Sequence, residues 1–129
     1  VSASGEIFSM QPVVIAFYSW LLKQTLNSQS AIAKPLEYVF NEDYSDSFLL
    51  EYQSVIGEMG DDTSTVEGLK KGMDNRFFDQ RLSGIKKVLK ENLGDRLAKS
   101  YEIKSSRNKG MMFYATDLLA EQVKFVDIK

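Results

Sequence analysis

Apolar residues recur along the first half of the chain with the period of an α-helix. From Met10 to about Leu26 they follow helical spacing, and Pro12 falls in the first turn, where proline is tolerated. A second apolar stripe occupies residues 48–59, after a candidate cap at Asp46 or Ser47. The pattern predicts two amphipathic helices whose apolar faces form the core.

The segments between these helices have the composition of connections. Pro35 is expected to begin one short helical turn that ends at Phe40, and residues 41–43 return to a loop. Residues 60–65, Gly-Asp-Asp-Thr-Ser-Thr, form the most turn-rich stretch of the chain and should end the second helix. Neither connection divides the chain, so we expect residues 1–129 to form a single domain.

The most informative segment begins with a cap at Asp74 or Asn75 and runs to about Leu93. Gly94 follows, at the position where a helix C-terminus favours a left-handed residue. The apolar stripe steps by 4, 3 and 4 and consists of Phe78, Leu82, Ile85 and Leu89. The opposite stripe has the same period, is polar or cationic throughout, and consists of Arg76, Gln80, Ser83, Lys87 and Lys90. This pattern predicts a long helix with one buried and one exposed face.

Two short runs with β-propensity follow this helix. They are residues 101–105 and 111–115, and the polar turn between them contains Gly110. The cations on or beside the turn are Lys104, Arg107 and Lys109. The runs predict a β-hairpin with a basic tip, and residues 117–129 carry enough apolar positions to pack back onto the domain. The expected fold class is therefore mainly α with a small β-hairpin, an α+β domain.

The composition excludes several classes of chemistry. The 129 residues include no cysteine and no histidine, which removes disulfides, thiolate nucleophiles, histidine bases and histidine-bound metals. The longest apolar run is too short for a membrane span. We therefore expect a cytoplasmic protein with no membrane contact, metal or cofactor. The N-terminal Val-Ser-Ala-Ser-Gly has neither an initiator methionine nor a signal pattern, so we expect the excised C-terminal part of a longer protein.

Charge is distributed unevenly along the chain. Residues 1–65 hold two lysines against nine carboxylates, a net charge of −7, whereas residues 66–129 hold fourteen basic residues against nine acids, a net charge of +5. A basic half can hold a phosphate backbone even though the whole chain has a net charge of −2. The alternative is a domain with one solvated basic face and one solvated acidic face.

Other candidate sites have simpler explanations. Tyr18 and Trp20 could form a stacking platform for single strands, but on an apolar helix they are expected in the core. The carboxylates at 42–46 and at 61–62 lack the spacing of a calcium loop. No glycine-rich phosphate loop is present, and no lysine sits in an apolar run that would lower its pKa. We therefore expect no enzyme activity.

The predicted elements come in the order of a winged helix-turn-helix domain. Shorter helices are followed by a long amphipathic helix and then by a hairpin with a basic tip. A helix fits the major groove of DNA, and a hairpin beside it reaches neighbouring phosphates or the minor groove. The side chains expected to contact nucleic acid are Arg76, Gln80, Ser83, Lys87, Lys90, Lys104, Arg107 and Lys109. The expected function is a regulatory module that binds duplex DNA.

The stretch from about Phe78 to Ala115, about a third of the chain, resembles the C-terminal part of the winged-helix domains of response-regulator transcription factors. The matching residues are Ile85-Lys86-Lys87-Val88-Leu89-Lys90, Gly94, Ile103, Arg107-Asn108-Lys109-Gly110 and Phe113-Tyr114. A further similarity is to winged-helix modules of CRISPR-associated sensor proteins, which also open with an aromatic-rich apolar helix. Both resemblances imply a fused sensor domain in the missing N-terminal part. The long loop before the helix and the acidic first half depart from the response-regulator pattern.

A second class of function fits the same features. Winged helices also mediate protein–protein contact, and the acidic first half would repel DNA wherever the two approached. The alternative is therefore an interaction or dimerisation module, for example a homodimer within a sensor protein, with no direct DNA contact.

Overall fold

The computed structural model describes residues 2–3, 6–7, 11–28, 32–57, 60, 63–101, 103–108, 110–115 and 123–124. The helices of these residues are α1 (Pro12–Ser28), α2 (Glu42–Ile56), α3 (Thr63–Gly68) and α4 (Asn75–Tyr101). The strands are β1 (Ser2–Ala3), β2 (Glu6–Ile7), β3 (Ile32–Ala33), β4 (Lys104–Asn108), β5 (Met111–Ala115) and β6 (Val123–Lys124). The described part is mainly helical with small antiparallel sheets, so the expected α+β class is confirmed.

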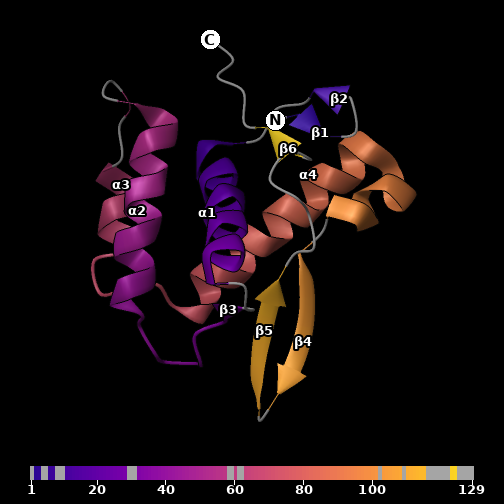
Figure 1. Cartoon of the computed structure of the whole chain (residues 1–129). Helices are drawn as coiled ribbons and strands as arrows, with labels where there is room; N and C mark the ends of the chain where they lie inside the picture. Colours follow the sequence, from indigo (N-terminus) through magenta and orange to yellow (C-terminus); the bar gives the residue numbers. More distant parts are fainter. Residues whose placement is uncertain are drawn as a thin grey trace.

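Helix α1 is the centre of the fold, between α2 and α4 (Figure 1). Its aromatic residue Phe17 is fully buried and contacts rings from both neighbours. The ring centroids of Phe48 on α2 and Phe78 on α4 lie 6.0 Å and 5.2 Å from that of Phe17. Tyr18 and Trp20 are also buried, so their assignment to the core is confirmed.

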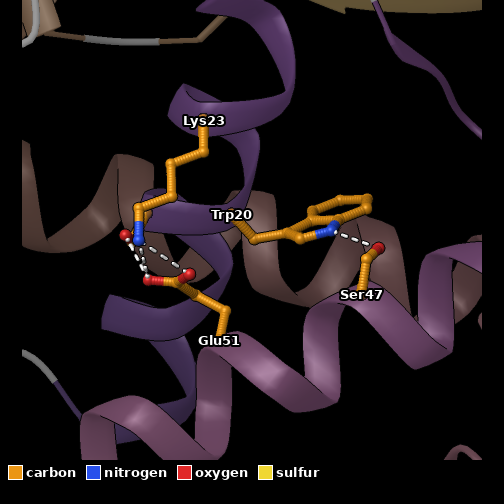
Figure 2. A network of polar contacts seen from close by, with 5 residues as sticks. Trp20, Lys23, Ser47 and Glu51 are labelled. Atoms are coloured by element: carbon orange, nitrogen blue, oxygen red, sulfur yellow. Dashed lines mark hydrogen bonds and ion pairs between the residues drawn. The ribbon is translucent and has the colours of Figure 1, made fainter. Parts of the chain in front are cut away.

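Polar side chains join α1 to α2 along one side of this core (Figure 2). The indole Nε1 of Trp20 donates a hydrogen bond to Ser47 Oγ at 2.8 Å. The Lys23 ammonium lies 2.9 Å from a carboxylate oxygen of Glu51, and Ser19 Oγ donates to the same carboxylate at 2.7 Å. Each partner sits on the facing helix, so the network fixes the register of α2 against α1.

The N-terminus of α2 lies five residues earlier than a cap at Asp46 would place it. Asn41 is the cap, and its side-chain oxygen accepts a hydrogen bond from the backbone N–H of Tyr44 at 2.9 Å. Glu42 and Asp43 then occupy the first turn, where carboxylates interact favourably with the helix dipole. The predicted loop at 41–43 and the predicted cap are therefore wrong, because these three residues together form a better helix start.

The start of α4 and the break in it agree with the sequence. Asp74 Oδ1 accepts a hydrogen bond from the backbone N–H of Phe77 at 2.9 Å, which confirms the predicted cap. Gly94 has φ 79° and ψ 166°, so it interrupts the helical backbone at the predicted position. A second helical segment nevertheless continues to Tyr101, and the hairpin strand consequently begins at Lys104 rather than at residue 101.

The hairpin is attached to the helices through β3, a two-residue strand that follows α1. Strand β5 lies in the middle of the sheet, between β3 and β4, and Ile32 pairs with Tyr114. The Tyr114 ring lies 5.3 Å from that of Phe78 on α4. The hairpin base is thus bound to the core, while its far end projects away from the helices (Figure 1).

The buried hydroxyl of Tyr18 gives a prediction for alkaline pH. It donates a hydrogen bond to the backbone oxygen of Tyr101 at 2.6 Å, and burial, with a smaller effect of Tyr101, raises its pKa above the ordinary value. Because the folded state holds this proton more tightly, the stabilisation is complete below about pH 10 and is lost as the pH rises further. We expect Tyr18→Phe to cost about 1 kcal/mol at pH 8.

Urea denaturation at pH 8 and pH 11 tests this prediction. The parent chain should lose more stability between the two pH values than Tyr18→Phe does, because the variant lacks the buried phenol. Equal losses in the two proteins would contradict the assignment of alkaline sensitivity to Tyr18.

Candidate nucleic-acid interface

The predicted polar stripe of α4 is exposed to solvent along its whole length. Arg76, Gln80, Ser83, Lys87 and Lys90 are all exposed, while Phe78, Ile85 and Leu89 on the other side are buried. Lys86, which is not among the predicted contact residues, is exposed as well. The structure therefore places the five predicted residues of α4 on one open helix face.

A hollow of about 490 Å³ lies where this face begins. Its lining combines aromatic, amide and charged side chains and consists of Glu37, Tyr38, Phe40, Asp74, Asn75, Arg76, Asp79 and Gln80. Arg76 and Gln80 are thus brought together in one concave surface, opposite the loop that precedes α2. Ser83, Lys87 and Lys90 continue along α4 but do not line the hollow.

Two of the three carboxylates in the hollow, Asp74 and Asp79, already have partners. Lys34 Nζ lies 3.0 Å from Asp79 Oδ1, and Asp74 caps the helix through the N–H of Phe77. With Glu37 and Arg76 included, the lining and Lys34 have a net charge of −1. The first turn of α4 is therefore nearly neutral, and the Asp74 side chain takes the helix N-terminal position that would otherwise attract a phosphate.

The wall of the hollow opposite α4 is a turn that the sequence did not predict. Val39 N–H donates to the Leu36 oxygen at 3.0 Å, and Tyr38 has φ 65°. A residue in this left-handed conformation cannot continue a helix, so the helical turn predicted from Pro35 to Phe40 is wrong. Tyr38 is 87% exposed and Phe40 48% exposed, so both rings remain accessible.

Both ends of this turn are fixed to other parts of the fold. On one side, the backbone N–H of Lys34 donates to the oxygen of Met112 in β5 at 2.8 Å. On the other, Asn41 and Met73 exchange two backbone hydrogen bonds of 2.9 Å. The turn is thereby positioned against the residues that begin α4, and the hollow has two supported walls.

The lysines further along α4 form the cationic part of its exposed face. Lys86, Lys87 and Lys90 lie within two turns of the helix, and all are exposed. Lys90 lies 3.6 Å from Asp95, but both side chains are largely exposed, and such a pair contributes little. We call Lys86, Lys87 and Lys90 the lysine cluster; it offers three charges to a polyanion.

The predicted hairpin cations form a separate group. Arg107 is exposed and its Nε donates to Met112 Sδ on the paired strand at 3.5 Å. Lys104 begins β4, but its side chain lies outside the described part, and Lys109 lies outside the described residues altogether. In the part of the chain that the structure describes, no hydrogen bond or ion pair joins Arg107 to α4.

One further cation of α4, Arg81, has a structural position. Its guanidinium lies 4.8 Å from the centroid of the Phe77 ring, and burial lowers its pKa. Its Nε is buried without a hydrogen-bond partner among the described residues. Arg81 therefore packs on the core and does not extend the exposed face.

The predicted contact residues omit Lys86 and the aromatic wall of the hollow. Lys86 lies beside the predicted stripe on an exposed arc broader than one row of residues. Tyr38 and Phe40 had a detectable signal: with Leu36 and Val39 they form a run of large apolar residues confined to five positions between Pro35 and a polar stretch, too short to be the buried face of a helix. Such a segment is a candidate surface, since large apolar patches are rare on monomers.

Across residues 2–124, wherever the structure describes them, no helix is long and apolar enough to cross a membrane. The same residues contain no group of three or more acidic side chains placed to hold a metal ion. Comparison of the chain with protein-family models, with curated proteins and with solved structures finds no match in any of the three.

Proposed function

We propose that this chain is a winged-helix module that binds duplex DNA as part of a larger regulatory protein. The observation that carries the proposal is the lysine cluster on the exposed face of α4, a helix whose other face is held in the core. A helix with this arrangement can enter a major groove without losing its packing. The hairpin β4–β5 follows α4 directly and is tied to the helices through β3.

The two parts of the exposed face suit different contacts. Arg76, Gln80 and Ser83 lie toward the N-terminal end, which is the end that contacts base edges in helix-turn-helix proteins. The lysine cluster follows one to three turns later and suits phosphate oxygens. Arg107 would add a phosphate contact from the hairpin.

The acidic helix α2 restricts the orientation in which DNA can bind. Its first turns expose Glu42, Asp43 and Asp46, which a polyanion would repel. Binding is therefore expected with the lysine cluster toward the phosphates and α2 turned away.

Salt dependence tests this function. The logarithm of the affinity for duplex DNA should fall linearly with the logarithm of salt concentration, with a slope of about −0.9 for each phosphate contacted. Replacing the lysine cluster by glutamine (Lys86→Gln, Lys87→Gln and Lys90→Gln together) should make the slope less steep by up to about 2.7. Fluorescence anisotropy of a labelled duplex between about 50 and 200 mM salt measures both.

The matched control is Lys23→Gln, which removes a lysine that is engaged with Glu51 on α2. Its slope should equal that of the parent chain. Arg107→Ala separately tests the hairpin and should make the slope less steep by about 0.9. Absence of duplex binding at the lowest salt, or a slope that the triple variant does not change, would contradict the proposal.

A protein-contact module is the second candidate, and the turn before α2 favours it. Leu36, Tyr38, Val39 and Phe40 are large apolar residues that are all at least 46% exposed, within five positions of one another. Exposed apolar groups gathered in this way are typical of interaction surfaces. Sedimentation equilibrium distinguishes this candidate. It is favoured if the parent chain forms a dimer that Tyr38→Ala dissociates and if the chain does not bind DNA.

A further inference from the structure

We propose that the hollow at the start of α4 receives one unpaired nucleobase, stacked on Tyr38. This inference rests on the proposed function and deepens it, because it names the part of the nucleic acid that the first turns of α4 recognise. In this assignment the lysine cluster contacts the phosphate backbone of the nucleic acid, and the hollow holds a base.

Tyr38 is the first support for this assignment. Its side chain is 87% exposed, so burial does not stabilise it, and its φ of 65° is a conformation that glycine adopts with less strain. Neither packing nor backbone preference therefore accounts for a tyrosine at this position. An accessible aromatic ring is the feature that proteins use to stack bases, and stacking tolerates any base.

The chemistry of the lining is the second support. Asn75 and Gln80 each offer an amide donor and acceptor, and Arg76 offers a planar set of donors. These are the groups that hydrogen-bond the edges of bases. The volume of about 490 Å³ lies within the range of small-molecule sites, so a base and part of its sugar can enter.

The charges of the hollow distinguish a base from the other ligands of this interface. Asp79 is paired with Lys34 and Asp74 with the helix N-terminus, and the two remaining charges, Glu37 and Arg76, are opposite in sign, so the hollow has little excess charge that would select a phosphate or a cation. A neutral aromatic heterocycle needs no such charge. Among the charged residues of the described lining, only Glu37 and Arg76 have no ion pair or hydrogen bond to another described residue, and each can take one edge of a base.

Spacing along α4 relates the hollow to the lysine cluster. From Arg76 to Lys86 the helix rises about 15 Å. This length corresponds to about four nucleotides stacked at 3.4 Å. A strand whose phosphates contact the lysine cluster can therefore place a base in the hollow about four nucleotides away. A base of an intact duplex is stacked and paired, so a bound duplex must extrude the base that enters the hollow, and a single strand presents such a base without the cost of unpairing it.

The experiment compares three labelled oligonucleotides that share one strand: a fully paired duplex, the same duplex with one unpaired base, and the single strand. 2-Aminopurine at the unpaired position reports stacking through loss of its fluorescence. We expect the parent chain to bind the two oligonucleotides with an unpaired base more tightly than the paired duplex. Tyr38→Ala should lose about 5- to 150-fold of affinity for those two alone.

Two further variants sharpen the test. Tyr38→Phe should keep most of the affinity for the unpaired base, because stacking needs the ring and not the hydroxyl. Leu50→Ala is the matched control: it removes an apolar side chain that is 71% exposed on α2 and does not line the hollow. It should leave all three affinities unchanged. Circular dichroism verifies that each exposed substitution leaves the fold intact.

The outcomes separate this inference from the proposed function. If Tyr38→Ala binds all three oligonucleotides like the parent while the lysine-cluster variant loses binding, nucleic acid is bound and the base site is wrong. If no oligonucleotide binds, the proposed function fails and the base site fails with it. If Tyr38→Ala changes only self-association in sedimentation, the turn is a protein contact and the base site is overturned.

Discussion

Replacing Phe17 by alanine is expected to lower the free energy of unfolding by about 3–5 kcal/mol, as for other buried aromatic residues. Phe17 is fully buried, and its ring lies within 6.1 Å, between centroids, of Trp20, Phe48, Phe77 and Phe78. Urea denaturation followed by circular dichroism measures the loss. Leu50→Ala, a truncation at an exposed position of α2, should change stability by less than about 0.5 kcal/mol.

The position of Phe17 also predicts how the loss is distributed. Its ring contacts residues of α2 and of α4, and Phe78 on α4 contacts Tyr114 of the hairpin. We therefore expect the helices, the hairpin and the exposed face of α4 to unfold together in the variant. A loss below about 1 kcal/mol, or a hairpin that unfolds in a separate transition, would contradict this view of a single core.

The elements that could be predicted from the sequence are those with a strong local period. The stripe at residues 78–89 identified the buried face of α4, and the same spacing identified the exposed face. Asp74 and Gly94 were identified as the cap and the break because each conformation depends mainly on the residue itself and its nearest neighbours. Residues 111–115 were recognised as a strand from their β-propensity and from the glycine-containing turn that precedes them.

The elements that could not be predicted depend on partners distant in the chain. The turn at 36–39 is fixed by β5 on one side and by the pairing of Asn41 with Met73 on the other. Strand β3 has only two residues, Ile32 and Ala33, which is too short to show alternation. The hollow exists only where these segments meet the start of α4, so no local pattern could have located it.

The structure distributes the charges of the second half differently from what their sum along the sequence suggests. The second half is basic overall, yet Asp74 and Asp79 place acidic groups at the start of the helix that carries the lysine cluster. The positive surface of α4 is therefore shorter than the sequence stripe, and Arg76 lies among carboxylates. A summed charge over a segment could not separate the lysine cluster from the hollow, since both lie on one helix.

Gly72 is the residue on which the geometry of the hollow depends most directly. It has φ +123°, and a Cβ added there would lie 2.9 Å from the carbonyl carbon of Phe40 and 3.0 Å from backbone atoms of Asn41. Backbone atoms cannot rotate away as a flexible side chain can. Gly72→Ala should therefore strain the backbone at residue 72 and push the turn of residues 36–39 away from the start of α4. We expect it to lower the free energy of unfolding by about 2–4 kcal/mol.

Gly68→Ala is the matched control for this substitution. Gly68 ends α3, and an added Cβ there would meet no atom within 4 Å. Alanine is also the better helix former, so the control should be neutral or more stable by up to about 1 kcal/mol. Urea denaturation gives both free energies of unfolding, and the 2-aminopurine signal shows whether the hollow is retained in Gly72→Ala at a temperature where this variant is still folded.

Parent-like stability in Gly72→Ala would mean that Asn41 and Met73 are not held as closely as their paired hydrogen bonds require. The two walls of the hollow would then be free to separate, and the base site would lose its structural basis.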